Sequence, residues 1–354
     1  MKKIVLTGGG TAGHVTPNIA LIPGLKERGF EIQYIGSYAG IEKKMIEDAG
    51  IPYLGISSGK FRRNLDLKNV TDVHKIFKGA REATTFLREY KPDIVFSKGG
   101  YVSVPVVRAA HWLHIPVIIH ESDLTPGLAN KLCFRAADKI CCNFPETLAY
   151  LPKEKAVLSG SPIRAELLSG KREEGLRFAG FDGAKPVLLM IGGSLGAQKL
   201  NEVLRAALPE LTQTYDVIHI AGKGNLAESL SDTPGYRQFE FVSAELKDVF
   251  AAADVVFSRA GANAICELLA LCKPNLLVPL PKESSRGDQI LNAASFEKQG
   301  YSMVMSQADL TPEKLVAALS DLFSRKDEYI HAMKNATESS GVNVVLGLID
   351  ELVP

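Results

Sequence analysis

Short apolar runs alternate with longer amphipathic stretches along the whole chain. The runs are bounded by glycine and polar residues, a pattern typical of strands buried in a parallel sheet. The stretches between them, such as residues 17–28 and 70–90, carry apolar residues at helical spacing. Strands separated by helices predict right-handed βαβ units and an α/β fold. The predicted strands are residues 3–6, 32–35, 93–97, 117–120, 139–142 and 156–158 in the first half, and 187–191, 217–221, 239–241, 255–258, 275–278 and 302–304 in the second.

The strand and helix series runs twice, and this suggests two domains. The chain has 354 residues, enough for two domains that each bury a core. We expect an N-terminal domain over residues 1–162 and a C-terminal domain over residues 163–336, with a solvent-exposed charged stretch at 171–174 (KREE). The segment 337–354 is expected to form a helix with one apolar face, which could pack on either domain.

The composition excludes several classes of protein. A formal net charge of +1 argues against a dedicated nucleic-acid binder. No apolar run is long enough to span a bilayer, and the N-terminus leads straight into a strand, so we expect a cytoplasmic protein. The five cysteines lack metal-ligand spacing and are expected to be reduced, mostly buried residues, without a metal site.

Two glycine-rich loops each follow a predicted strand and precede a predicted helix. Residues 8–14 read GGGTAGH, and residues 192–197 read GGSLGA. Glycines at such turns let backbone N–H groups approach an anion, and the helix N-terminus adds partial positive charge. The first loop differs from the GxGxxG dinucleotide fingerprint, and no acid clearly ends the second predicted strand. The pair predicts two nucleotide-type domains with a ligand held between them.

His14, at the end of the first loop, and two further polar segments follow predicted strands, where open α/β sheets bind ligands. His14 is a candidate general base, or it only orders its loop. Residues 97–103 (SKGGYVS) form either an anion-binding loop or a tight turn. Residues 120–123 (HESD) either contribute to a ligand site or cap a helix through Ser122 or Asp123.

The segment 258–267 (SRAGANAICE) gives the sharpest pattern. A strand ends at small residues where a helix begins, so the first helical N–H groups can meet a diphosphate. Arg259 would neutralise its charge, and Glu267 could accept hydrogen bonds from a ribose; a salt bridge between the two is the alternative. Gln289 suits sugar hydroxyls, or lies in a solvated loop. Because Asp-x-Asp and GxxxxGK[ST] are both absent, helix termini and arginine are expected to balance the diphosphate instead of a metal.

Together these motifs resemble the MurG family over essentially the whole chain. This is the family of UDP-N-acetylglucosamine:N-acetylmuramyl-(pentapeptide) pyrophosphoryl-undecaprenol N-acetylglucosaminyltransferases. The resemblance implies a GT-B fold, with two Rossmann-like domains facing across a deep cleft and helix 337–354 packed on the N-terminal domain. It also implies inverting transfer of GlcNAc from UDP-GlcNAc to the C4 hydroxyl of the muramyl sugar of lipid I, forming lipid II, without a cofactor. The motifs are GGGTAGHVTPN, KGGYVS, HESDLTPGLANK, GSPIR, GGSLGAQKLN, SRAGANAICE and DQILNA.

The resemblance assigns roles residue by residue, with His14 as the catalytic base. Many family members carry Asn where this chain has Asp123, and the Asp carboxylate lacks the hydrogen-bond donor of the Asn amide. Many also carry Gln where this chain has Leu195. The implied acceptor-binding residues are Gly9, Gly10, Gly99, Gly100 and Tyr101. The implied UDP-GlcNAc-binding residues are Thr11, Ala12, Gly13, Asp123, Arg164, Ser194, Val242, Arg259, Ala262, Asn263, Ala264, Ile265, Cys266, Glu267 and Gln289.

Because lipid I is a membrane lipid, the resemblance implies a peripheral protein on the inner face of the cell membrane. Residues 61–63 (FRR) and a helix carrying Lys75, Ile76, Phe77, Lys78 and Arg81, together with Trp112, could bind anionic lipids, although Ile76 and Phe77 could be core residues. Proteins of cell-wall synthesis are possible partners. The competing functions are a diacylglycerol glycosyltransferase, a UDP-GlcNAc 2-epimerase and a non-catalytic nucleotide-sugar sensor.

Overall fold

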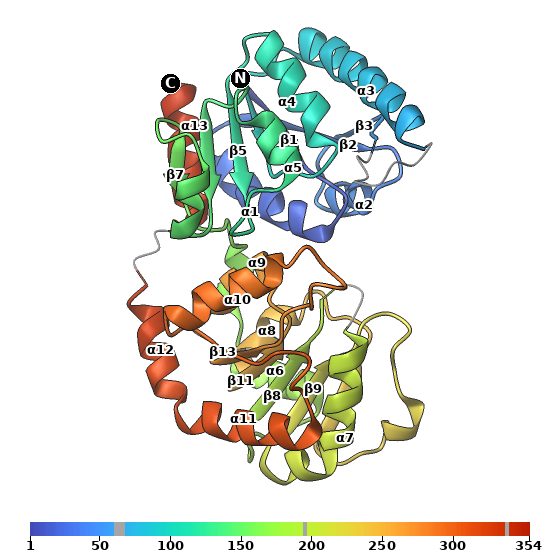
Figure 1. Ribbon diagram of the computed structural model, residues 1–354, viewed down its shortest axis with the longest axis vertical. Helices are drawn as coiled ribbons and strands as arrows, with labels where there is room; N and C mark the ends of the chain where they lie inside the picture. The colour runs from blue at the N-terminus through green and yellow to red at the C-terminus, as the bar shows by residue number, and fades with distance from the viewer. Residues whose placement is uncertain (60–67, 194–196, 337–339) are drawn as a thin grey trace. The chain divides into compact units, whose positions relative to one another are not determined.

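The computed structural model describes residues 1–59, 68–193, 197–336 and 340–354, which fall into two compact units (Figure 1). Unit 1 consists of Met1–Arg164 and Glu338–Pro354, and unit 2 of Ala165–Thr337. Among the described residues, no helix combines the length and the apolar character that crossing a bilayer requires.

Unit 1 is built around a seven-stranded sheet of described residues in the order β3-β2-β1-β4-β5-β6-β7, with all pairs parallel. The strands are β1 (Lys2–Thr7), β2 (Phe30–Ser37), β3 (Tyr53–Ile56), β4 (Ile94–Ser97), β5 (Val117–Glu121), β6 (Lys139–Cys142) and β7 (Ala156–Leu158). The helices are α1 (Thr16–Glu27), α2 (Ile41–Asp48), α3 (Lys68–Tyr90), α4 (Ser103–Trp112), α5 (Leu128–Cys133) and α13 (Gly341–Leu352), with short 3₁₀ helices at Ala12–His14 and Pro145–Tyr150.

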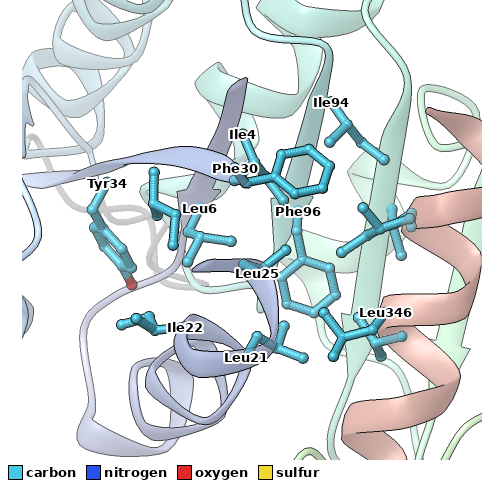
Figure 2. Packing of buried hydrophobic residues seen from close by; sticks show 14 of the residues in the cluster. Ile4, Leu6, Leu21, Ile22, Leu25, Phe30, Tyr34, Ile94, Phe96 and Leu346 are labelled. Atoms are coloured by element: carbon cyan, nitrogen blue, oxygen red, sulfur yellow. The ribbon is translucent and has the colours of Figure 1, made fainter. Parts of the chain in front are cut away.

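Alternate residues of the central strands feed two separate cores. Ile4 and Leu6 face a core completed by α1, α2 and α13, whereas Val5 faces one completed by α3, α4 and α5. Figure 2 shows Leu346 of α13 packed beside Phe96 of β4 in the first core. The C-terminal helix therefore belongs to the core of unit 1, and both faces of the sheet are covered, as is usual for parallel sheets.

Unit 2 contains a six-stranded parallel sheet of described residues in the order β10-β9-β8-β11-β12-β13. The strands are β8 (Val187–Ile191), β9 (Asp216–Ile220), β10 (Tyr236–Phe239), β11 (Val255–Ser258), β12 (Asn275–Leu277) and β13 (Met303–Val304). The α-helices are α6 (Arg172–Ala179), α7 (Gln198–Thr214), α8 (Leu246–Ala252), α9 (Ala262–Ala270), α10 (Asp288–Lys298), α11 (Pro312–Ser324) and α12 (Lys326–Lys334), and 3₁₀ helices lie at Ala165–Ser169 and Glu228–Leu230.

The predicted α/β fold with two parallel sheets is confirmed, and the errors lie at the sheet edges. The sequence analysis missed β3, and it placed the strand at 239–241 too late, because β10 ends at Phe239. Tyr236 is buried and begins the pairing with β9, whereas Phe241 is 73% exposed. An edge strand has one neighbour and little burial, so its apolar pattern is weak.

In each sheet the strand order reverses once. The reversal lies between β1 and β4 in unit 1, and between β8 and β11 in unit 2. Loops that leave the carboxyl ends of such neighbouring strands diverge to opposite faces of the sheet, and the space between them is where open α/β sheets bind ligands.

Candidate functional site

In unit 1 the first glycine loop, residues 8–14, and the glycine-containing segment 97–103 pack directly against each other, and we call them the paired glycine loops. Gly10 and Gly100 have φ angles of 90° and 86°, which residues with a Cβ rarely adopt. A Cβ on Gly100 would collide with the backbone oxygen of Gly9, and a Cβ on Gly10 would lie 2.9 Å from the ring of Tyr101. The glycines therefore allow the close approach of the loops that follow β1 and β4.

Two of these glycine N–H groups point into the protein. The N–H of Gly10 donates to the carboxylate of Glu42 over 3.2 Å, and the N–H of Gly99 to the hydroxyl of Ser97 over 3.2 Å. Glu42 is fully buried at the start of α2 and also accepts the N–H of Ser37 over 3.0 Å. Sequence reasoning missed Glu42, whose only signal was a carboxylate in the first turn of a helix after β2.

His14 ends the 3₁₀ helix that follows the first loop, and its ring is held in place. Its Nδ1 lies 3.0 Å from the hydroxyl of Thr11, and its carbonyl accepts a hydrogen bond from buried Asn18 over 3.1 Å. These contacts restrain an imidazole, a group able to serve as a general base near neutral pH, at the end of the first loop.

A buried carboxylate organises the loop after β5. Glu121 accepts hydrogen bonds from the N–H groups of Ser122, Asp123 and Gly127, at 2.9, 3.1 and 2.9 Å, and from Nδ2 of Asn130 at 2.8 Å. Burial raises the pKa of Glu121 above its ordinary value. The expected alternative, a helix capped by Ser122 or Asp123, is wrong, since α5 starts after Gly127 without a side-chain cap.

A buried ammonium links the loops after β4 and β5. Lys98, 1% exposed, donates to Nδ1 of His120 over 2.6 Å and to the hydroxyl of Ser122 over 2.8 Å. Burial, together with the neighbouring Lys98 charge, holds the pKa of His120 well below its usual range. The neutral ring then accepts at Nδ1 and donates from Nε2 to the carbonyl of Gly160 at 3.0 Å.

In unit 2 the reversal point places a helix N-terminus after β11. Helix α9 begins at Ala262 behind Gly261, which provides no side-chain cap. The first N–H groups of a helix lack partners within the helix and attract anions. Gly193, in the loop after β8, has a φ of 87°. Ser194, a predicted donor contact, and Leu195, where many family members carry Gln, lie outside the described residues.

The guanidinium of Arg259 is buried at the same point. Its Nη1 donates to the carbonyls of Val278 and Pro279 at 3.1 and 3.3 Å, and its Nη2 to Oε1 of Gln307 at 2.7 Å. Burial lowers the pKa of Arg259 to about 10, so it stays protonated at neutral pH. Arg259 therefore ties the ends of β11 and β12 together beside the N-terminus of α9.

Gln289 lies near the start of α10 and is oriented by the backbone. Its Oε1 accepts the N–H of Leu280 over 3.0 Å, which leaves its amide nitrogen as the donor toward a ligand. Arg164 and Val242 are half-buried in loops, and the Nε of Arg164 has no hydrogen-bond partner within the described parts of the chain.

The structure thus places the proposed site residues in two groups, one in each unit. Unit 1 holds Gly9, Gly10, Thr11, Ala12, Gly13, His14, Gly99, Gly100, Tyr101 and Asp123, and unit 2 holds Arg259, Ala262, Asn263, Ala264, Ile265, Cys266, Glu267 and Gln289. In unit 1 all of them except Asp123 follow β1 or β4, and in unit 2 all except Gln289 follow β11, while Asp123 follows β5 and Gln289 lies in α10. Among the described residues, no group of three His, Cys, Asp or Glu side chains could hold a metal ion.

Comparison with known proteins connects these features to one family. Residues 4–142 match the N-terminal domain of glycosyltransferase family 28, and residues 187–345 match its C-terminal domain. The chain is 60% identical over 352 residues to the UDP-N-acetylglucosamine--N-acetylmuramyl-(pentapeptide) pyrophosphoryl-undecaprenol N-acetylglucosamine transferase of Lachnoclostridium phytofermentans, covering 99% of each chain. It is 58% identical to the protein of the same name from Lachnospira eligens, again over 99% of each chain. The crystal structure of Acinetobacter baumannii MurG superposes with a TM-score of 0.77 at 27% identity, covering 99% of this chain and 100% of that one. The chain belongs to the MurG family.

Membership in the MurG family confirms the resemblance read from the motifs. It also confirms the glycosyltransferase type of the two-sheet fold. The roles of the individual MurG-like site residues, the domain limits and the cleft stay predictions.

Proposed function

We propose that this chain transfers N-acetylglucosamine from UDP-N-acetylglucosamine to N-acetylmuramyl-(pentapeptide) pyrophosphoryl-undecaprenol, lipid I, to form lipid II. The observation that carries the proposal is 58–60% identity over 99% of the chain to relatives named for this transfer. The transfer goes to the C4 hydroxyl of the muramyl sugar and inverts the anomeric carbon.

His14 is the general base of the proposed reaction. As the C4 hydroxyl oxygen bonds to the anomeric carbon, the bond from that carbon to the UDP oxygen breaks, and the hydroxyl proton passes to Nε2 of His14. The hydrogen bond between Nδ1 and the Thr11 hydroxyl supports this role, because it restrains the orientation of the ring. One displacement from the face opposite UDP gives inversion.

The donor is proposed to bind unit 2. The N-terminus of α9, at Ala262–Ala264 in our proposal, would face the diphosphate, and buried Arg259 adds positive charge beside it. These groups stabilise the negative charge that develops on UDP as it leaves. Glu267 would accept hydrogen bonds from the ribose, and the amide of Gln289 would donate to a sugar hydroxyl.

The acceptor is proposed to bind the paired glycine loops of unit 1. Because the N–H groups of Gly10 and Gly99 already donate inward, these residues would contribute the shape of the loops, and the anion would meet other N–H groups. The remaining assignments, Thr11, Ala12, Gly13 and Asp123 to the donor, follow the resemblance.

A second proposal concerns the membrane, because undecaprenol is a membrane lipid. Phe77 of α3 and Trp112 of α4 are 72% and 65% exposed, and Arg88 lies 5.6 Å from the Trp112 ring. The expectation that Phe77 could be a core residue is therefore wrong. Aromatic side chains beside basic ones favour docking on anionic lipids. Residues 61–63 of the predicted patch lie outside the described residues, and the inner membrane face and partners in cell-wall synthesis stay predictions.

Transfer of labelled GlcNAc to a short-chain lipid I analogue in EDTA tests the function. We expect a labelled product with a new bond at the muramyl C4 oxygen, since the sequence offers no Asp-x-Asp metal motif. UDP-GlcNAc binding without transfer would contradict the proposal. Transfer to diacylglycerol, or C2 epimerisation of UDP-GlcNAc without any acceptor, would identify the competing functions.

A further inference from the structure

A cavity of about 580 Å³ lies in unit 1 beside the paired glycine loops. Its walls come from the segment after β2, the end of β3 and α3, and Tyr101 forms the wall toward the loops. The same Tyr101 ring lies next to Gly10. The cavity therefore begins where the proposed acceptor site ends.

A second cavity, of about 500 Å³, continues along α3. It shares Tyr38, Ile56 and Lys78 with the first cavity, and we call the two together the α3 groove. The groove follows α3 from His74 to Glu89. At 1.5 Å per residue this stretch of helix is about 22 Å long. A fully extended pentapeptide spans at most about 18 Å, so the groove can take its whole length.

The first cavity combines positive charge, hydroxyl groups and apolar surface. His74, Lys75 and Lys78 line it, and none of its described lining residues is acidic. Ser57 and Ser58 offer hydroxyls, and Ile56 offers apolar surface. A site for phosphate alone needs only donors, whereas this mixture suits a peptide, whose amides, side chains and carboxylate require different partners.

Glu82 fixes the junction of the two cavities and leaves Lys78 available to a ligand. The carboxylate accepts the N–H of Ser57 over 2.6 Å and the hydroxyl of Tyr38 over 3.1 Å. Its distance to the ammonium of Lys78 is 3.8 Å, and the Lys78 side chain is 60% exposed. Because an ammonium has three N–H donors, Lys78 can also bind a second carboxylate.

We propose that the α3 groove binds the pentapeptide of the acceptor, with a peptide carboxylate at Lys78 and the muramyl end toward Tyr101. The inference rests on the proposed function, because the peptide is part of the proposed acceptor. It makes Lys78 a specificity-determining residue for the acceptor, with no part in binding UDP-GlcNAc.

The test compares two soluble acceptors with the same short lipid chain, one with the pentapeptide and one without it. For the unaltered protein we expect a lower KM with the pentapeptide. Lys78→Gln should raise that KM about fivefold, the upper range for an exposed charge pair, and Lys78→Glu should raise it further. Neither variant should change kcat/KM for the peptide-free acceptor or the KM for UDP-GlcNAc.

Lys43→Gln is the matched control, because Lys43 is also half-exposed, also lies near a glutamate four positions on (Glu47, 4.0 Å), and is outside the groove. Equal losses with both acceptors would overturn the inference and assign Lys78 to the pyrophosphate. A loss confined to acceptor in anionic vesicles would assign it to lipid headgroups and overturn the inference as well. If the unaltered protein transfers to neither acceptor, the proposed function itself fails.

Discussion

Replacing Gly100 by alanine tests whether the close packing of the two glycine loops holds unit 1 together. Gly100 has a φ of 86°, and an added Cβ would meet the backbone oxygen of Gly9, which has no flexible side chain to move away. The substitution therefore combines a conformational cost with a collision. Gly50, with a φ of 69° and nothing within 4 Å of an added Cβ, provides a control that carries the conformational cost alone.

The two costs can be separated by comparing the variants. A left-handed conformation costs a residue with a Cβ about 1–2 kcal/mol, and the stiffer unfolded chain returns about 0.4–1 kcal/mol. Gly50→Ala should therefore lower the free energy of unfolding by about 1 kcal/mol. Gly100→Ala must also shift one loop against the other, and overpacking of this kind adds about 1–3 kcal/mol. We expect a total loss of about 2–4 kcal/mol.

Urea unfolding followed by circular dichroism measures the stability, and transfer to the short-chain acceptor measures the effect on the site. We expect Gly100→Ala to raise the acceptor KM more than the KM for UDP-GlcNAc, since most of the proposed donor contacts lie in unit 2 and only Thr11–Gly13 share the displaced loop. Equal stabilities of the two variants, with an unchanged acceptor KM, would refute the argument. Unit 1 and unit 2 can unfold separately, so the transition that each substitution moves must be identified.

Three further predictions concern the base, the pH dependence and the membrane. His14→Ala should lower kcat about 10²–10⁴-fold while calorimetry shows UDP-GlcNAc binding intact; parallel loss of binding would indicate a structural role. Burial lowers the pKa of His219 to about 3, so below its ordinary pKa of 6.5 the unfolded chain binds a proton that the folded protein excludes. The contribution of neutral His219 to the free energy of unfolding is present above pH 6.5 and falls by about 2 kcal/mol between pH 7 and pH 5. Urea titrations of His219→Gln should not show this fall. Phe77→Ser with Trp112→Ser should weaken sedimentation with anionic vesicles and leave transfer to a soluble acceptor unchanged; unaltered sedimentation would remove the docking proposal.

The sequence predicted the central strands well because burial on both faces leaves a continuous apolar run, as in 94–97 and 255–258. It failed at β3 and β10, which lie at sheet edges. The loops at the reversal points were also found, since glycine and polar residues after a strand form a local pattern. Segments of this kind can be predicted from local sequence alone, without knowing which distant residues they contact.

The residues that hold the loops in place could not be predicted in this way. Glu42 is separated by 32 positions from Gly10, whose N–H it accepts, and Lys98 by 22 positions from His120. Each is an ordinary charged residue in the sequence, and its role exists only when the strands bring the two segments together. Long-range partners of this kind need the fold before they can be recognised.

The N–H groups of the unit 1 glycine loops have different hydrogen-bond partners from those that the motif predicts. A glycine loop is expected to direct N–H groups outward to an anion, but Gly10 and Gly99 direct theirs to Glu42 and Ser97. Glycine is required there because the loops touch and adopt positive φ angles. Glu42 thus acts as an internal hydrogen-bond acceptor that sets the loop before any ligand arrives, and a site fixed in this way loses less entropy on binding. Glu42→Gln retains one acceptor oxygen. It should therefore reduce the free energy of acceptor binding by more than it reduces the free energy of unfolding. A larger loss of stability than of acceptor affinity would make Glu42 a purely structural residue.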